Sequence, residues 1–370
     1  MYHFLVGTKA QFIKLAPVML EMDRRGIPYR HLDLGQHAAT TERLRRVFAL
    51  PPPAVHLRRQ EGDITRVGTA IGWASGLLLR ARLSPGWRRR LFPEPGLCLI
   101  HGDTLSTLLG LHLARAAGLP VAHVEAGLRS FHLLDPFPEE LIRIHCMRRA
   151  DYLFCPDDGS VRNLQAMRVR GRIQRLSGNT VIDAVRLMAA GERPLPGLPA
   201  SYGVATCHRL ETLSRGARLQ RVVQLLNQVA ERIPVLFVVH HPTRQALARH
   251  GLAHRLGSGV RILDPLDYAG FLPLLRDAAL VLTDGGSIQE ECASLGRPCV
   301  VLRNRSERPD GLGANAMLWN GDDQAVMAFV AERARHQRAP LTGGASPSAE
   351  IVDFLEQRQR ERRQGTGPGG

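Results

Sequence analysis

Three carboxylates stand where catalytic acids and bases are often found. Asp103 and Glu125 each follow a short apolar run, and one helical pattern separates the two runs. If the runs are neighbouring parallel strands, about 4.8 Å apart, both carboxylates leave the same edge of a sheet. Glu139 and Glu140 open the next helical pattern, and one of them can face that edge too. The pattern favours acid–base chemistry.

These acids also have plainer interpretations. Asp103 could cap the helix that begins near Leu105, and the helix dipole favours glutamates at a helix start. Neither explains Glu125, which stands in Val-Glu-Ala-Gly directly after an apolar run. The sequence therefore favours catalysis over capping for Asp103 and Glu125.

A glycine-containing turn in the second half of the chain is typical of a phosphate site. Thr283-Asp284-Gly285-Gly286-Ser287 joins a strand pattern to a helix pattern. Glycines let a phosphate approach backbone N–H groups, and a helix N-terminus carries positive potential. Glu290 and Glu291 follow one turn later, where a carboxylate can accept ribose hydroxyls. A solvated pair of glutamates fits that pattern equally well.

Two pairs of basic residues follow strand patterns in the same half. His208-Arg209 comes after residues 204–207, and His240-His241 comes after residues 235–239. A lone histidine is more often a packed or surface residue, but two pairs at strand ends favour phosphate contacts or acid–base work. No zinc-binding pattern such as H-E-x-x-H occurs, so no metal is expected.

Lysine is almost absent from the chain. Of 49 lysine and arginine residues, only Lys9 and Lys14 are lysine, and both lie at a predicted strand-to-helix turn. If base composition explains the arginine bias, two retained lysines are candidates for chemistry. Two surface lysines placed by chance are the alternative.

Strand and helix patterns that alternate along the chain must position these residues. Such alternation is typical of parallel sheets built from βαβ units. We predict strands at residues 2–6, 29–34, 98–101, 120–124, 152–155 and 173–176, then at 204–207, 235–239, 260–263, 280–282 and 299–302. The fold class is therefore α/β, with two Rossmann-like, doubly wound parallel sheets. Two such domains are expected to face a central cleft at the carboxyl ends of their strands, where ligands bind.

The length supports two domains, because single cores stop growing at about 250–300 residues and this chain has 370. We predict an N-terminal domain at residues 1–192 that carries the acids and a proline-rich linker at 193–203. The second domain, at 204–348, would bind the nucleotide. A charged helix at 349–363 and a disordered tail at 364–370 would follow.

Composition excludes several classes of protein. The net charge of +15 could suggest a nucleic-acid partner, but the basic residues are spread out and aromatics make up only 5%. No apolar run approaches the ~20 residues that span a bilayer, and the N-terminus lacks a secretory pattern. Six cysteines without a C-x-x-C pair suggest buried thiols and a cytoplasmic location.

Eight blocks of the sequence resemble, in order and spacing, the non-hydrolysing UDP-N-acetylglucosamine 2-epimerases. With the start at Gly7 they reach about Asp310, and they read HGDTLSTLLG, VAHVEAGLRS, FPEELIR, GNTVIDAV, CHRLET, DPLDYAGF, TDGGSIQEE and RNRSERPD. This resemblance implies the two-domain arrangement called GT-B, a homodimer, a UDP-sugar substrate, no cofactor and no required metal.

The family reaction explains why several acids are needed. Carbon 2 is not next to a carbonyl, so its proton is removed as UDP leaves carbon 1. The resulting 2-acetamidoglucal takes UDP back after reprotonation from the other face, which requires carboxylates on both faces and a held diphosphate. The resemblance implies catalytic roles for Asp103, Glu125, Glu139 and His208. It implies substrate binding by Lys9, Lys14, Arg143, Arg209, Gly285, Gly286, Ser287 and Glu291.

The chain departs from the family pattern at four places. Gly7-Thr8-Lys9-Ala10-Gln11 replaces G-T-R-P-E, so a bidentate arginine becomes a point-charge lysine. Gly285-Gly286-Ser287 replaces S-G-G, and Ile142 replaces the asparagine before the motif arginine. Ala38-Ala39-Thr40 replaces a polar run that helps bind a second, activating UDP-sugar in bacterial members. These departures bear on the sugar and on regulation.

Other functions fit parts of the pattern. A hydrolysing 2-epimerase, or a 2-epimerase of another UDP-2-acetamido sugar, would use the same residues. A GT-B glycosyltransferase would share the fold and the UDP site, but it would need an acceptor and no set of convergent carboxylates. A catalytically idle UDP-sugar-binding protein is the alternative that the departures at Lys9 and Gly285 favour most.

Overall fold

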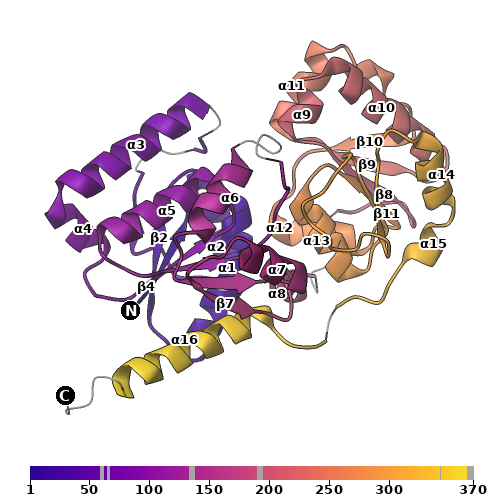
Figure 1. Cartoon of the computed structure of the whole chain (residues 1–370). Helices are drawn as coiled ribbons and strands as arrows, with labels where there is room; N and C mark the ends of the chain where they lie inside the picture. The colour runs from indigo at the N-terminus through magenta and orange to yellow at the C-terminus, as the bar shows by residue number, and fades with distance from the viewer. Residues whose placement is uncertain (59–61, 65–66, 133–137, 190–194, 342, 365–370) are drawn as a thin grey trace. The chain divides into compact units, whose positions relative to one another are not determined.

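The computed structural model describes residues 1–58, 62–64, 67–132, 138–189, 195–341 and 343–364 (Figure 1). Its internal contacts form two compact units. Unit 1 comprises Met1–Ala184 with Ala345–Gly370, and unit 2 comprises Val185–Gly344. Residues 193–194 of the predicted linker and residues 365–370 of the predicted tail lie outside the described residues. Gln364, which we assigned to a disordered tail, is helical instead.

In the described part of unit 1, seven parallel strands form one sheet in the order β3-β2-β1-β4-β5-β6-β7. The strands are β1 (Tyr2–Val6), β2 (Tyr29–Asp33), β3 (Val55–His56), β4 (Leu97–His101), β5 (Val121–Val124), β6 (Tyr152–Cys155) and β7 (Arg172–Arg175). The central strands β1, β4 and β5 are buried throughout, as expected for a parallel sheet covered on both faces. The strand order reverses between β1 and β4.

Helices cover the two faces of this sheet. The helices are α1 (Lys9–Arg24), α2 (Ala38–Val47), α3 (Val67–Leu83), α4 (Pro85–Leu91), α5 (Leu105–Ala116), α6 (Glu139–Met147), α7 (Asp158–Ala166), α8 (Val181–Met188) and α16 (Pro347–Gln364). Helix α1 packs against α2 and α16, whereas α5 packs against α3 and α6. The division between the units falls within α8.

Local sequence sets the start of α1 at the switch point of the sheet. Thr8 caps the helix, and Gln11 completes a capping box with it. The Gln11 amide also donates to the carbonyl of His101, at 2.9 Å, and to Thr107 Oγ1, at 2.9 Å. One side chain therefore ties the turn after β1 to the turn after β4.

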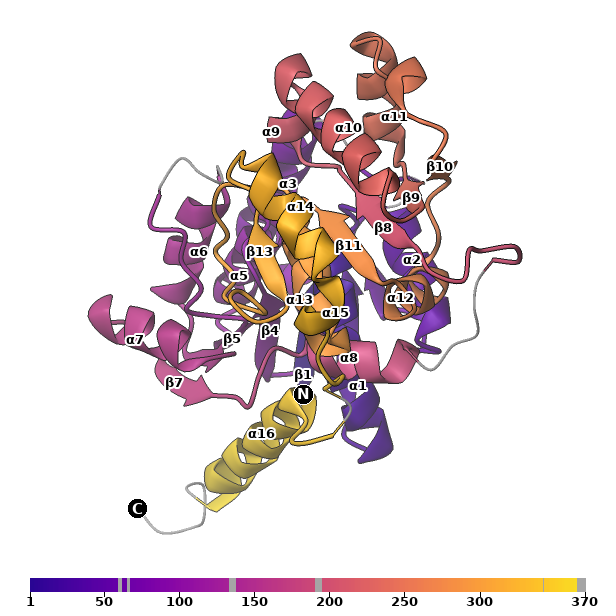
Figure 2. The same ribbon diagram turned by 90° about the vertical axis from the view of Figure 1, so that its right-hand side faces the viewer.

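Unit 2 has a second parallel sheet, in the order β10-β9-β8-β11-β12-β13 for its described residues. Its strands are β8 (Gly203–Thr206), β9 (Val235–Val238), β10 (Val260–Leu263), β11 (Leu280–Thr283), β12 (Cys299–Val301) and β13 (Ala316–Leu318). Its helices are α9 (Leu210–Leu213), α10 (Gly216–Ala230), α11 (His241–Arg249), α12 (Tyr268–Arg276), α13 (Gly286–Leu295), α14 (Asp323–Ala331) and α15 (Arg333–His336), with a 3₁₀ turn at Ala253–Arg255. Helices α10 and α14 pack side by side (Figure 2).

The C-terminal helix α16 returns to unit 1, as Figure 1 shows. Ile351, Val352 and Leu355 on this helix are fully buried. The Leu355 carbonyl accepts a hydrogen bond from the Tyr2 hydroxyl at 2.7 Å. The chain therefore enters unit 2 once and comes back to complete unit 1.

The two parallel sheets confirm the predicted fold class, and every predicted strand is present to within one or two residues. The short elements β3, β13, α4 and α9 were not predicted, because two to seven residues carry too little periodicity. Helices α14 and α15 are separated at Glu332, whose backbone (φ −96°, ψ 12°) leaves the helical region.

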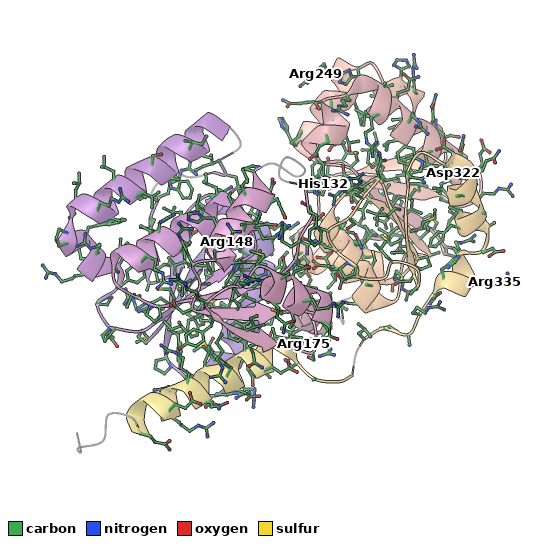
Figure 3. The ribbon with its side chains drawn as sticks, viewed as in Figure 1. His132, Arg148, Arg175, Arg249, Asp322 and Arg335 are labelled. Atoms are coloured by element: carbon green, nitrogen blue, oxygen red, sulfur yellow. The ribbon has the colours of Figure 1, made fainter. Side chains whose placement is uncertain are left out.

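Three features of the described residues concern nucleic-acid binding, membrane insertion and metal binding. Figure 3 labels Arg148, Arg175, Arg249 and Arg335, which are all exposed and lie on separate elements of the two units. Among the described residues, no helix is long and apolar enough to cross a membrane. Within the same residues, no group of three or more histidine, cysteine or acidic side chains could hold a metal ion.

Candidate active site

Glu125 is a buried carboxylate at the carboxyl edge of the unit 1 sheet. It directly follows β5, and its φ of 65° is unusual for a residue with a side chain. Lys14 forms an ion pair with Glu125 Oε2, and the two side chains are only 2% and 4% exposed. Asn179 Nδ2 donates to the same oxygen at 2.6 Å. His101 Nε2 lies 3.6 Å from it.

These partners explain how the Glu125 carboxylate can be charged although it is buried. Taking a carboxylate out of water costs several kcal/mol, which a well-placed cation and hydrogen bonds can offset. Lys14 supplies the cation from the second turn of α1, and Asn179 lies just before α8. Lys14, which we predicted to bind substrate, is thus engaged with Glu125. Glu125 and Asn179 line a small recess together with Val124, Phe154, Pro156, Leu176, Gly178 and Thr180.

Asp103 belongs to a second ion-pair group at the same edge. Arg143 Nη2 pairs with Asp103 Oδ2, and Arg143 Nη1 donates to Glu140 Oε2 at 2.9 Å. Glu140 is fully buried and pairs also with Arg129. Although burial alone raises the pKa of Glu140, the hydrogen bonds from Arg129 and the Ser130 amide bring that pKa below its ordinary value.

The capping explanation for Asp103 is wrong. Thr104 is the N-cap of α5 and forms a capping box with Thr107, so the carboxylate of Asp103 is not needed there. Both Asp103 and Glu125 act electrostatically on His123 of β5, which places them near one buried side chain. Burial lowers the pKa of His123 to about 4.

Glu139 is the predicted third acid. It is the first residue of α6 and is half-buried, and its Oε2 is shielded from solvent. Arg143 links Asp103 to Glu140, the residue next to Glu139. Glu140 pairs with two arginines, Arg129 and Arg143, and the role of Glu139 as an acid stays a prediction.

Lys9 stands at the switch point of unit 1. Lys9 is the first residue of α1 and half-buried, and its backbone N–H donates to His37 Nδ1 at 3.4 Å. Burial is the main cause of a lowered His37 pKa, and Lys9 lowers it further. The Asp63 carboxylate accepts hydrogen bonds from the amides of Ala39 and Thr40 at the start of α2.

In unit 2, the turns after β8 and β11 meet at Asp284. This carboxylate is fully buried and accepts hydrogen bonds from the backbone N–H groups of His208 and Arg209. His208 is partly exposed, while the Arg209 side chain turns to Glu211, with Nε and Oε2 3.3 Å apart. His240 is the N-cap of α11, and His241 is its exposed first residue. The expectation that the His240-His241 pair makes phosphate contacts or acts in acid–base chemistry stays a prediction.

The predicted phosphate turn forms the start of α13. Gly285 is its N-cap and supplies no side-chain hydrogen bond, and the half-buried Ser287 is its second residue. A Cβ at Gly286 would come within 2.5 Å of Arg308 Nε, so this glycine admits the guanidinium. Arg308 is held by an ion pair with Glu290. The first turn thus presents backbone amides beside a fixed positive charge.

The two glutamates of α13 are not a solvated pair. Glu290 and Glu291 are 1% and 3% exposed, so that alternative is wrong. Glu290 serves Arg308, whereas Glu291 faces the Tyr268 hydroxyl, whose pKa burial and Glu291 raise well above its ordinary value.

A family model described as UDP-N-acetylglucosamine 2-epimerase matches residues 22–350. The chain belongs to this family. UDP-N-acetylglucosamine 2-epimerase of Yersinia pestis is 30% identical over 355 residues, which cover 90% of this chain and 91% of that protein. The Pseudomonas aeruginosa UDP-2,3-diacetamido-2,3-dideoxy-D-glucuronate 2-epimerase is 29% identical, over 95% and 98%.

The fold of this epimerase family is also found in solved structures. The Methanocaldococcus jannaschii UDP-GlcNAc 2-epimerase, crystallised with UDP-GlcNAc and UDP, aligns with a TM-score of 0.82 at 26% identity. That alignment covers 96% of this chain and 99% of the other. Membership of the epimerase family thus rests on sequence and fold together.

Several residues of the candidate site in units 1 and 2 were not predicted. They are His101, Arg129, Asn179, Asp284 and Arg308. All lie inside the sequence blocks that carry the family resemblance, but no residue type or spacing distinguished them. Their roles depend on which side chains meet in space, and a linear pattern does not encode that.

Proposed function

We propose that this chain interconverts UDP-N-acetylglucosamine and UDP-N-acetylmannosamine by epimerisation at carbon 2. UDP would leave and add back through a 2-acetamidoglucal intermediate. The observation that carries the proposal is the pair of carboxylates after β4 and β5, Asp103 and Glu125, each held by its own cation. Membership of the 2-epimerase family supports the choice of reaction.

The proposed proton transfers belong to unit 1. Epimerisation needs one group to remove the carbon 2 proton and another to return a proton to the opposite face. Glu125 and Asp103 suit these tasks because Lys14 and Arg143 fix them at the carboxyl edge of neighbouring strands. Glu139, half-buried at the start of α6, is the proposed third acid.

The nucleotide is proposed to bind unit 2. In the first turn of α13, the backbone amides of Gly286 and Ser287 can donate hydrogen bonds to phosphate oxygens, and Arg308 adds positive charge beside them. The Gly285 amide donates to Thr283 Oγ1 at 3.0 Å, so Gly285 would contribute by its small size. The Glu291 carboxylate, one turn along the same helix, would accept the ribose hydroxyls. His208, Arg209 and Lys9 complete the proposed substrate contacts.

Incubation with UDP-N-acetylglucosamine in deuterated water tests the reaction. We expect deuterium at carbon 2 of both nucleotide sugars and a mixture of epimers by NMR, with UDP retained in the products. Free N-acetylmannosamine and UDP would instead identify a hydrolysing 2-epimerase. Absence of both exchange and epimer would reject the proposal.

A second candidate substrate is another UDP-2-acetamido sugar. The relative named for UDP-2,3-diacetamido-2,3-dideoxy-D-glucuronate is 29% identical over nearly the whole of both chains, about the same as for the UDP-N-acetylglucosamine enzymes. Both sugars carry the 2-acetamido group that the reaction needs. A higher kcat/KM for the diacetamido glucuronate would select it.

We also propose that the enzyme is a cytoplasmic homodimer. The six cysteines are all buried free thiols, which fits a reducing compartment. Ile71, Leu79 and Leu83 of α3 are each more than half exposed, which supports a second copy as their cover. Sedimentation of the wild type and of Leu79→Asp tests the dimer: a monomeric wild type would reject it.

A further inference from the structure

Asp284 holds a negative charge beneath the loop that carries His208. Its oxygens accept hydrogen bonds from the backbone N–H of His208, at 3.0 and 3.1 Å, and from that of Arg209, at 3.0 Å. The Cys207 thiol donates to Oδ2 at 3.3 Å. In the described part of the chain, the one ion-pair partner of Asp284 is His208, whose Nδ1 lies 3.4 Å from Oδ1.

The His208 ring lies between this carboxylate and the start of α13. A Cβ added at Gly285 would lie 2.8 Å from Cε1 and 3.4 Å from Nε2 of the ring, so the Nε2 edge lies beside the helix N-cap. Strands β8 and β11, which precede His208 and Asp284, are neighbours where the strand order of the sheet reverses. Ligands of open α/β sheets bind at this place.

We propose that Asp284 is a positioning residue for His208. The carboxylate orients the imidazole through Nδ1 and stabilises its protonated form, so that Nε2–H is directed at an anion beside the first amides of α13. The added proton comes from solvent, and no covalent bond forms or breaks. The anion is the diphosphate of a nucleotide sugar, an assignment that rests on the proposed function, whereas the coupling of Asp284 to His208 does not.

Other charged groups face His208 and oppose this effect. The His240 ring, at the N-cap of α11, lies edge-to-face with a centroid distance of 6.1 Å. Arg209 is the next residue and is paired with Glu211. A charged His240 and Arg209 both disfavour protonation of His208. Asp284 favours it, because an opposite charge within about 4–6 Å stabilises the ionised form.

In a purely structural role, Asp284 would only hold the loop after β8 in place through backbone hydrogen bonds. That role and the positioning role both predict that losing the carboxylate lowers stability, so a stability measurement does not separate them. The proton affinity of His208 does, because backbone hydrogen bonds to Asp284 do not depend on the charge of the ring.

NMR titration of histidine-labelled full-length protein measures that affinity. We expect Asp284→Asn to move the titration midpoint of His208 to lower pH by about one unit or more. Cys207→Ala is the matched control, because it removes a donor to the same carboxylate but keeps the charge. A folded Asp284→Asn protein with an unchanged midpoint overturns the proposal, as does an equal shift in the control.

The wild type provides a second test that needs no variant. Nitrogen chemical shifts show which ring nitrogen carries the proton in neutral His208. The proposal requires the proton on Nδ1, facing Asp284. A proton on Nε2 instead overturns it.

Calorimetry with UDP-N-acetylglucosamine tests the ligand. We expect affinity to fall as pH rises through the His208 midpoint, and to fall at lower pH in Asp284→Asn. The NMR shift could be found while the affinity for UDP-N-acetylglucosamine stays constant through the titration midpoint of His208. In that case the diphosphate assignment is wrong and the positioning role of Asp284 stands. If the sugar does not bind at all, it is the proposed function that fails.

Discussion

Glu125 and Asp103 differ from ordinary surface carboxylates in the cations that hold them. Lys14 reaches Glu125 from α1, and Arg143 reaches Asp103 from α6. The sequence placed both acids at strand ends, because apolar runs followed by a polar residue are visible in a linear pattern. The partners were not predictable, since they lie 111 and 40 positions away along the chain.

Loss of either acid should stop the reaction but not folding. We expect Glu125→Gln and Asp103→Asn each to lower turnover by about 10² or more, because each amide keeps the size but not the proton chemistry. Asp158→Asn, an exposed helix-start carboxylate paired with Arg175, is the matched control and should keep full activity. Near-normal turnover in an acid variant removes that residue from the mechanism.

Lys14 should matter for stability as well as for activity. Lys14→Met leaves Glu125 buried without its cation, which we expect to lower the free energy of unfolding by about 3–5 kcal/mol. Adding Glu125→Gln removes the stranded charge, so the double variant should regain part of this loss. Urea unfolding of the three proteins measures it. A double variant less stable than Lys14→Met would contradict the ion-pair explanation.

At the scale of elements, the N-termini of helices provide much of the proposed substrate site. The α13 start was predictable as a phosphate turn because Gly-Gly between a strand and a helix is a local pattern. Its closeness to Arg308 was not, since that residue follows β12 in an irregular segment. Likewise, Thr104 instead of Asp103 caps α5, because two adjacent polar residues fit the same pattern and only backbone geometry selects one.

Gly286 tests the α13 start directly. We expect Gly286→Val to weaken UDP binding at least tenfold, because a Cβ within 2.5 Å of Arg308 Nε pushes the guanidinium away and blocks the amides. Gly203→Ala in β8 is a matched control, since its Cβ would find ordinary contacts from 3.6 Å outward. Unchanged UDP affinity by calorimetry in Gly286→Val would place the nucleotide elsewhere.

At the scale of the whole chain, the two units differ in buried histidines. His3, His31 and His123 lie on strands β1, β2 and β5 of unit 1, and burial lowers the pKa of each to about 4. Each is therefore neutral in the folded unit and takes up a proton on unfolding below about pH 6.5. The two-sheet architecture was predictable from alternating patterns, but this asymmetry was not, because burial is a property of the assembled sheet.

Unit 1 should lose stability first on acidification. A folded pKa below the unfolded one means that the contribution is complete above pH ~6.5 and is lost as pH falls toward 4, by roughly 1–3 kcal/mol for each histidine. Hydrogen exchange at pH 7 and pH 5, corrected for intrinsic rates, measures it. We expect protection to drop in unit 1 more than in unit 2, and His31→Gln to reduce the drop. Equal losses in both units would refute this.

The return of α16 to unit 1 has a consequence for protein synthesis. The ribosome makes all of unit 2 before it makes Ile351, Val352 and Leu355, which complete the packing around α1. Until then the surface of α1 that these residues cover is open to water, along with the Tyr2 hydroxyl that later donates to Leu355. Unit 2 can therefore finish folding on the ribosome, while unit 1, although begun first, is completed last.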